Sequence, residues 1–201
     1  MSTEQDADRE SGRTSERDNG CDNGRDRGLL IRKAEANDVP VILRFINELA
    51  EYEKLAHEVE ADEAKLRETL FGTRPAAEVL IAELTASGKA GSAEAEPVGF
   101  ALFFHNYSTF VARPGLYLED LYVTPAARGR GIGLALMRHL AAIAVERRCG
   151  RFEWSVLDWN EPSIDFYRRL GAVSMDDWTI FRISGDALMK LASGRPIRQV
   201  D

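Results

Sequence analysis

Two stretches of the sequence carry residue types that could perform chemistry, and the first is a glycine-punctuated turn. It reads Arg-Gly-Arg-Gly-Ile-Gly at residues 128–133 and follows the run Leu-Glu-Asp-Leu-Tyr-Val at 118–123. A strand that passes through such a turn into a helix exposes unpaired backbone N–H groups and the positive end of the helix dipole, which together bind phosphate groups. The glycines would let a ligand approach the backbone closely, but a tight strand-to-helix turn explains them as well.

Two familiar nucleotide-binding motifs do not fit this turn. A Walker loop requires lysine followed by serine or threonine after its last glycine, whereas Leu134 and Ala135 stand there. A dinucleotide-binding fold places its glycine loop after the first strand rather than past the middle of the chain. We therefore expect neither of these two modes of nucleotide binding.

The second stretch, at residues 160–172, has the sequence of one short capped helix. Asn160 can cap its start, a proline suits its first turn, and Gly171 can end it. Phe166 is expected in the core, whereas the adjacent Tyr167 faces another direction. Because a single tyrosine on a helix is far more often structural than catalytic, Tyr167 gains weight only from the motifs around it.

The order of these two stretches resembles the GCN5-related N-acetyltransferase (GNAT) superfamily, and within it the diamine (spermidine/spermine) and thialysine acetyltransferase branch. The resemblance rests on Leu-Tyr-Leu-Glu-Asp before the turn, Arg-x-x-Gly-x-Gly in it, and Trp-Asn-Glu-Pro-Ser with Phe-Tyr-x-x-x-Gly after it. It extends from Leu29 to about Leu191. It implies an α/β fold in which a mixed central sheet with splayed parallel strands is flanked by helices.

The resemblance also implies where acetyl-CoA binds, namely where the strand through residues 121–123 separates from the strand through 153–155. Backbone groups of Leu121 and Val123 would hold the acetyl and pantetheine portions, and Asn160 would contact the cofactor arm. The turn that Arg128 opens would hold the pyrophosphate through the amides of Gly129, Arg130, Gly131, Ile132 and Gly133.

The implied reaction is the attack of an amine on the thioester carbonyl of acetyl-CoA. An ammonium with a reference pKa of about 10.4 must first lose a proton, and the leaving thiolate benefits from receiving one. The resemblance makes Tyr167 the general acid and Glu119 the base, either directly or through water, while Tyr52, Glu53 and Asp176 match positions that line the amine site. Without the family, Glu119 would be interpreted as an exposed strand carboxylate or an arginine's partner.

One departure from the family bears on the substrate. Polyamine-specific members carry an aspartate and a tryptophan in the loop before the Leu-Tyr-Leu-Glu-Asp strand, whereas residues 107–112 read Tyr-Ser-Thr-Phe-Val-Ala here. A long polycation would lose a carboxylate and an aromatic wall for its distal charge. This favours a thialysine-like or lysine-like amine, or a short diamine, over spermidine or spermine.

Two other functions stay open at this point. One is a non-catalytic acyl-CoA-binding regulatory module, and the other is an acetyltransferase that acts on protein or antibiotic amines. A pure binding module needs neither Tyr167 nor Glu119, so their joint presence favours an enzyme. The motifs alone do not exclude other amines.

The composition limits the class of protein. The 201 residues, 44% of them hydrophobic and 29% charged, suit one soluble globular domain without a membrane-spanning run. The net charge of −7 provides no broad basic surface for nucleic acid. Two cysteines, no apolar leader and no metal-type spacing among His57, His105 and His139 lead us to expect a cytoplasmic protein without a metal. The resemblance adds a homodimer.

We expect a tail, a domain and a second, shorter tail. Residues 1–27 hold eight acidic and five basic side chains and no leucine, isoleucine, valine or aromatic residue. Such a segment cannot offset its ordering entropy by burial. The expected divisions are a disordered tail at 1–28, the acetyltransferase domain at 29–192 and a C-terminal tail at 193–201.

Hydrophobic periodicity predicts the elements of the domain. Strands are expected at residues 29–34, 79–84, 97–104, 115–123, 151–157 and 178–183. Helices are expected from a cap at Asn37 or Asp38 to Tyr52, and at residues 62–71, 134–145 and 162–170, with a lengthened hairpin loop at 85–96.

Overall fold

The computed structural model describes residues 28–85 and 95–196. The expected N-terminal tail before residue 28, most of the 85–96 loop and the last five residues of the C-terminal tail lie outside these residues. The chain divides into two compact units, one up to Ser155 and one from Val156 onward.

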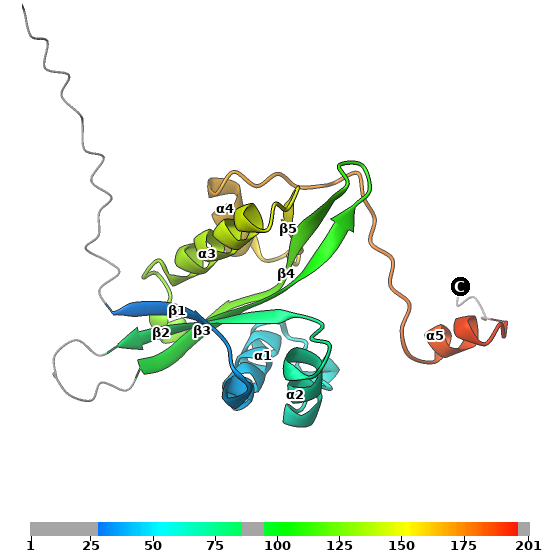
Figure 1. Ribbon diagram of the computed structural model, residues 1–201, viewed down its shortest axis with the longest axis horizontal. Helices are drawn as coiled ribbons and strands as arrows, with labels where there is room; N and C mark the ends of the chain where they lie inside the picture. The colour runs from blue at the N-terminus through cyan, green and yellow to red at the C-terminus, as the bar shows by residue number, and fades with distance from the viewer. Residues whose placement is uncertain (1–27, 86–94, 197–201) are drawn as a thin grey trace, which may run out of the picture. The chain divides into compact units, whose positions relative to one another are not determined.

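The first unit contains one five-stranded sheet with the strand order β1-β2-β3-β4-β5 (Figure 1). Neighbouring strands from β1 to β4 are antiparallel, and β5 is parallel to β4. The mixed α/β sheet that the sequence predicts is therefore confirmed. The strands are β1 (Leu29–Lys33), β2 (Glu78–Thr85), β3 (Ala95–Ser108), β4 (Arg113–Val123) and β5 (Phe152–Trp154).

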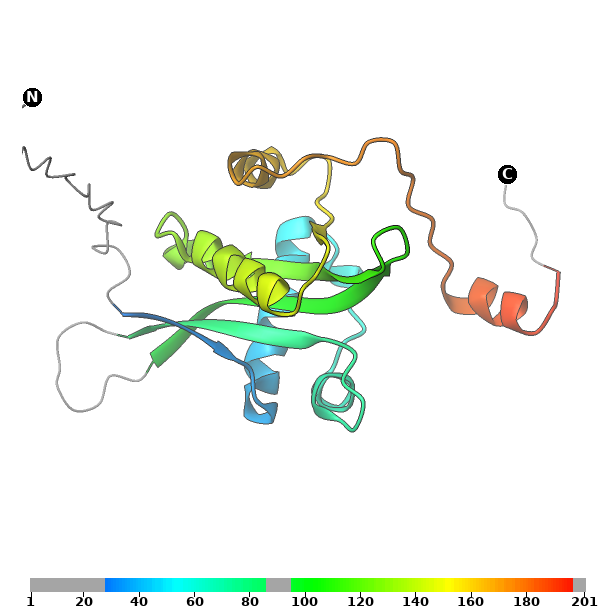
Figure 2. The ribbon, with the colours of Figure 1, turned by 45° about the horizontal axis from the view of Figure 1, so that its top comes forward.

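Helices cover both faces of this sheet. Helices α1 and α2 lie on one face and α3 on the other (Figures 1 and 2). Of three short 3-10 turns, η1 and η3 lie between a strand and a helix, and η2 lies between α1 and α2. The helical segments of this unit are η1 (Ala36–Asp38), α1 (Val39–Glu53), η2 (Ala56–Glu58), α2 (Glu63–Phe71), η3 (Pro125–Ala127) and α3 (Ile132–Glu146).

The core fills the space between α1, α2 and the sheet. Val39, Ile42 and Phe45 recur at helical spacing on one face of α1 and are fully buried. The residues that they pack with come from α2 and three strands: Leu66, Leu70, Val79, Ile81, Phe100 and Tyr122. The apolar periodicity of the sequence thus predicts correctly which face of α1 is buried.

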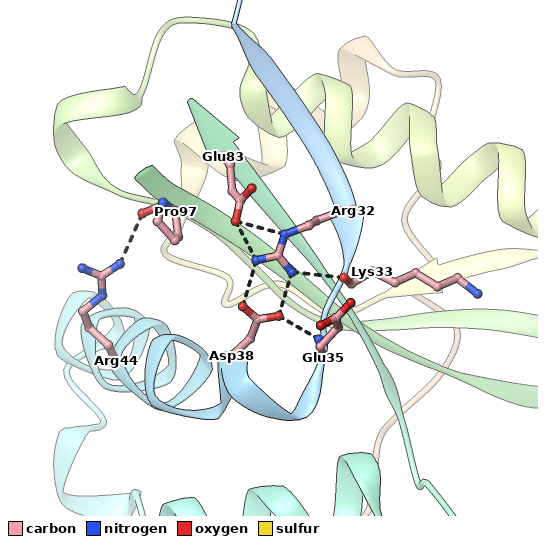
Figure 3. A network of polar contacts seen from close by, with 7 residues as sticks. All are labelled: Arg32, Lys33, Glu35, Asp38, Arg44, Glu83 and Pro97. Carbon is pink, nitrogen blue, oxygen red and sulfur yellow. Dashed lines mark hydrogen bonds and ion pairs between the residues drawn. The ribbon is translucent and has the colours of Figure 1, made fainter. Parts of the chain in front are cut away.

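Arg32 on β1 joins the edge strand to β2 and to the start of α1 (Figure 3). Its guanidinium donates to both carboxylate oxygens of Asp38, at 2.7 and 2.8 Å, and its Nε and Nη2 donate to Glu83 Oε1 at 3.0 and 2.6 Å. These bonds hold the pKa of Asp38 below its ordinary value. The Asp38 side chain therefore does not cap α1, because Arg32 and the backbone N–H of Glu35 occupy it.

The second unit contains two helices, α4 (Glu161–Arg169) and α5 (Gly185–Ala192). As predicted, Asn160 precedes α4 and its side chain accepts a bond from the Ser163 N–H, while Gly171 follows it with a φ of +88°. The predicted strand at 178–183 is wrong, since the described residues give this segment no strand structure. An apolar pattern indicates a strand, but only a neighbouring strand can pair its backbone.

In the part of the chain that the structure describes, no helix is both long and apolar enough to span a bilayer.

Replacing Arg32 with methionine should lower the free energy of unfolding by about 2 kcal/mol, because the buried carboxylate of Glu83 loses its cation. Lys33→Met is the matched control. It removes an exposed cation whose Nζ lies 3.8 Å from Glu78, so its effect should stay below about 0.5 kcal/mol. Urea denaturation at pH 7 measures both values.

The pH dependence adds a second check on this network. The pairing of Asp38 stabilises the fold above the ordinary pKa of 3.8 and is lost as the pH falls through the lowered pKa of the folded state. The difference between wild type and Arg32→Met should therefore shrink in acid. Equal effects of Arg32→Met and Lys33→Met at pH 7 would contradict the assignment.

Candidate active site

A β-bulge interrupts strand β4 at Glu119. Leu118 pairs with Phe103 of β3 and Asp120 pairs with Leu102, so Glu119 is the extra residue between two consecutive pairs. A bulge breaks the alternation of side chains and re-aims one of them. Here Leu118 is buried, Glu119 is exposed and Asp120 is largely buried.

The bulge coincides with the end of the parallel ladder between β4 and β5. The pairs of this ladder run from Leu116 with Phe152 to Leu118 with Trp154. Beyond Leu118, β4 continues to Val123 and stays paired with β3 on its other side. The backbone of β4 at Leu121 and Val123 thus extends past β5, as the predicted splay of the two strands requires.

Three carboxylates interact around the bulge. Burial raises the pKa of Asp120 to about 6, and the negative charges of Glu119 and Glu53 contribute to this rise. Burial also raises the pKa of Glu53, which lies at the last position of α1. Within the described residues, no ion pair joins any of the three to a lysine or arginine. The site therefore has an uncompensated negative charge.

The glycine turn leaves open space over its backbone. Gly129 and Gly131 have φ values of +74° and +83°, which side chains rarely adopt, and a Cβ at either position would meet no heavy atom within 4 Å. Gly131 is also the N-cap of α3 and, as a glycine, has no side chain that could accept a hydrogen bond from the first N–H groups of that helix. Open backbone at a helix N-terminus is what the binding of a pyrophosphate requires. Arg130, Ile132 and Gly133 belong to the same turn and the first turn of α3.

The side chain of Arg128, which opens the turn predicted to bind the cofactor, contacts protein groups on two other elements. Its Nε donates to the carbonyl oxygen of Val123 at 3.0 Å, and its Cζ lies 4.9 Å from the ring centroid of Tyr52. It therefore contacts the ends of both β4 and α1. Tyr52 is 37% exposed and lies beside Glu53 in the last turn of α1, so the structure brings both predicted amine-site residues to that helix end.

Three predicted site residues belong to the second unit. Tyr167 lies on α4, half-buried, with its ring centroid 5.2 Å from that of Phe166. Asn160 is 6% exposed and caps α4, which gives its side chain a structural role in addition to the predicted contact with the cofactor. Asp176 is exposed and accepts a bond from the Ser174 hydroxyl at 3.1 Å.

No cluster of three or more histidine, cysteine, aspartate or glutamate side chains suited to a metal ion occurs in the described ranges, 28–85 and 95–196.

Comparison with known proteins identifies the family to which the chain belongs. The profile of the Acetyltransferase (GNAT) family matches residues 44–172, which include the bulge, the turn and α4. The chain belongs to the GNAT acetyltransferase family. It is an enzyme of this family, whose members use acetyl-CoA as co-substrate, and the fold and family predicted from the sequence are confirmed.

Individual relatives share most of this GNAT chain. Thialysine N-ε-acetyltransferase of Sus scrofa is 43% identical over 82% of this chain and 97% of its own length. L-Ornithine N5-acetyltransferase of Arabidopsis thaliana is 34% identical over 80% of this chain and 86% of its own. An integron cassette protein from the mobile metagenome of V. cholerae superposes with a TM-score of 0.66 at 28% identity, over 82% of this chain and 98% of that structure.

Sequence reasoning missed Asp120 as part of the acidic site. In a regular strand, adjacent residues point to opposite faces, so Glu119 and Asp120 would not be expected to act together. The signal was present as two consecutive carboxylates in an otherwise apolar strand. Only the bulge and the burial of Asp120 make the pair part of one site.

Alanine at Gly131 should weaken acetyl-CoA binding by about tenfold, because a Cβ would occupy the space over the turn that the pyrophosphate needs. Alanine is chosen because any side chain is strained at a φ of +83° and alanine adds less strain than a β-branched residue, and the control below has the same kind of strain. Calorimetric titration with acetyl-CoA measures the affinity. Gly194→Ala is the control, since Gly194 also has a positive φ, +68°, and open space but follows α5. Equal affinities of the two variants would contradict the assignment of the turn.

Asparagine at Asp120 should raise the free energy of unfolding at pH 7.5 by about 1–3 kcal/mol, because a pKa raised from 3.8 to about 6 means that the folded state disfavours the charged carboxylate. The gain should shrink as the pH falls from 6 to 4, where wild-type Asp120 becomes protonated in the folded state. Urea denaturation across this range is the measurement. The control Glu68→Gln changes an exposed carboxylate of α2 and should have little effect. A loss of stability in Asp120→Asn would show that this carboxylate is not under electrostatic stress.

Proposed function

We propose that this acetyltransferase moves an acetyl group from acetyl-CoA to the primary amine of a small substrate of the thialysine, lysine or ornithine type, or of a short diamine. The observation that carries the proposal is the cluster of Glu53, Glu119 and Asp120, which has no cation of its own in the described residues. A substrate ammonium would supply that cation. The similarity to thialysine and ornithine acetyltransferases supports the same substrate class.

The cluster lowers the cost of bringing a charged amine out of water. An ammonium beside Asp120 would favour the ionised carboxylate and lower its raised pKa toward the ordinary value. A bound ammonium would thus remove the electrostatic repulsion that destabilises the ionised carboxylates in the free enzyme. This exchange selects for positively charged substrates over neutral alcohols or amides.

In the proposed reaction, the substrate ammonium loses one proton before the attack and a second one after it, and Glu119 accepts each in turn through water and passes it to solvent. The nitrogen attacks the thioester carbonyl carbon, so a C–N bond forms and the C–S bond breaks. Tyr167 gives its phenolic proton to the leaving sulfur and regains one from solvent. Backbone groups of Leu121 and Val123 hold the acetyl and pantetheine portions, and Asn160 contacts the cofactor arm.

The loop argument against polyamines concerns a turn that is distant from Glu119 along the chain. The β3–β4 turn at Thr109–Ala112 precedes β4, and its last residue is seven residues from Glu119, or about 23 Å along an extended strand. Within one chain, the missing aspartate and tryptophan therefore do not border the bulge. The preference for a small amine rests instead on the carboxylate cluster and on the substrates that name the relatives.

Other parts of the proposal concern the state of the protein in the cell. We infer a homodimer from the family resemblance, a cytoplasmic location from the composition, and no nucleic-acid or membrane partner from the acidic net charge and the apolar pattern. The tail at residues 1–27 is inferred to be dispensable because of its polar composition. Light scattering of the full chain and of a chain that begins at residue 28 tests both the dimer and the tail.

A panel of amines with acetyl-CoA, read out by product mass, tests the function. It contains thialysine, lysine, ornithine, putrescine, spermine, a peptide N-terminus and an aminoglycoside. We expect one of the first four to exceed spermine in kcat/KM by about tenfold or more. Spermine as the best substrate by that margin, or reaction of the peptide or the aminoglycoside alone, would overturn the substrate class.

Two variants in the same assay test the role of Tyr167. Tyr167→Phe should lower kcat by more than about tenfold with little change in acetyl-CoA affinity, because a proton donor acts mainly in the transition state. Tyr107→Phe is the control, because Tyr107 is an exposed tyrosine of β3, and it should keep wild-type turnover. Wild-type turnover in Tyr167→Phe would return this residue to a packing role.

A further inference from the structure

The side chain of Arg128 turns from the glycine turn back toward β4 and α1. Its guanidinium lies over two tyrosine rings, with Cζ 4.9 Å from the centroid of Tyr52 and 5.7 Å from that of Tyr122. Its Nε donates to the Val123 carbonyl oxygen at 3.0 Å. The guanidinium thus combines two ring contacts with a hydrogen bond, a combination that the ammonium of lysine can reproduce only in part.

Arg128 continues a row of aromatic rings that begins in the core. The ring centroids of Phe100 and Phe45 are 5.6 Å apart, and those of Phe45 and Tyr122 are 6.0 Å apart. Phe45 and Tyr52 are seven residues apart on α1, close to two helical turns, and so lie on the same face. The buried part of this face packs on Tyr122, and its exposed end contacts Arg128.

The two ends that Arg128 contacts carry different parts of the proposed reaction. The end of α1 holds Tyr52 and Glu53, which belong to the amine side. The end of β4 holds Val123, which belongs to the acetyl side. Transfer requires the amine nitrogen and the acetyl carbon to meet in a defined geometry, so a contact that fixes one end to the other affects the rate.

Resting on the proposed function, we propose that Arg128 is a positioning residue that fixes the amine-binding end of α1 to the acetyl-binding end of β4, and that it is not a ligand of the pyrophosphate. The neighbouring Arg130 provides the contrast. It is exposed on the same turn and, in the described part of the chain, forms no ion pair or ring contact. Its charge is available to the phosphates.

The expected effect of losing Arg128 depends on how exposed its side chain is. Arg128 is exposed, and an exposed cation–π contact changes a local equilibrium by about two- to fivefold. Loss of Arg128 should therefore leave the core folded and change the alignment of α1 and β4.

Arg128→Met and Arg130→Met, measured side by side on the full chain, test the proposal. In Arg128→Met we expect the KM for thialysine to rise by about two- to fivefold while the acetyl-CoA Kd stays at the wild-type value. In Arg130→Met we expect the reverse pattern, with a weaker acetyl-CoA Kd and an unchanged KM for thialysine. Arg128→Lys should restore part of the KM, since its ammonium can still lie over a ring. The proposal is overturned if Arg128→Met loses acetyl-CoA affinity and keeps the wild-type KM.

A double-mutant cycle with Tyr52→Leu tests the partner. If Arg128 acts through Tyr52, the effect of Arg128→Met on KM should be at most about half as large in the Tyr52→Leu background. Effects that simply multiply would show that Arg128 acts elsewhere. If Arg128→Met fails to fold, Arg128→Gln takes its place in the same cycle.

The same cycle measured by thermal denaturation requires no substrate, so it separates this proposal from the proposed function. If the wild type acetylates no amine of the panel, the proposed function fails, and the coupling between Arg128 and Tyr52 in Tm still decides whether the contact exists. Additive shifts in Tm would overturn the contact itself. Coupled shifts together with an unchanged KM would overturn its role in positioning.

Discussion

The separation of β4 from β5 after Leu118 is the constraint on which the rest of the structure depends. Up to that residue β4 is held on both sides, and beyond it only β3 pairs with the strand. The bulge at Glu119 falls at the same point, and the Glu119 side chain is exposed there. Because β4 continues through η3 into the glycine turn and α3, one continuous segment presents a carboxylate, open strand backbone and open helix N–H groups in that order.

The same segment explains why the site carries electrostatic stress. A carboxylate placed on a strand that also packs against a core must be partly buried. Burial is the largest cause of the raised pKa of Asp120. Two further carboxylates nearby increase the cost. A fold selected for stability alone would place a cation or an amide there, as the network of Arg32 with Asp38 and Glu83 does at the other end of α1. A carboxylate with a raised pKa and no neighbouring cation is typical of a site that binds a charged ligand.

The sequence predicted well what depends on local periodicity. The bounds of α1, α2 and β2 were close to those observed, because each buries one face and repeats its apolar residues accordingly. The sequence predictions failed where the structure of a segment depends on a residue or strand that is distant in the chain. Residues 178–183 are rich in aromatic and β-branched residues but have no strand structure. Asp38, one of the two residues expected to cap α1, binds Arg32 six residues earlier in the chain instead. Asp120 was missed because a bulge is a property of two paired strands.

The proposed division of the site between β4 and α1 would let its two sides change independently. The proposed acetyl side lies on a strand whose pairing and buried residues fix its position, whereas Tyr52 and Glu53 occupy the last turn of α1, which is followed by Lys54 with a φ of +63°. Substitutions in a terminal helical turn disturb the core less than substitutions in a central strand, because fewer buried contacts depend on them. An amine site built there can change its substrate while the strand, turn and helix that serve acetyl-CoA stay the same. Relatives named for thialysine and for ornithine, each similar to most of this chain, are consistent with that separation.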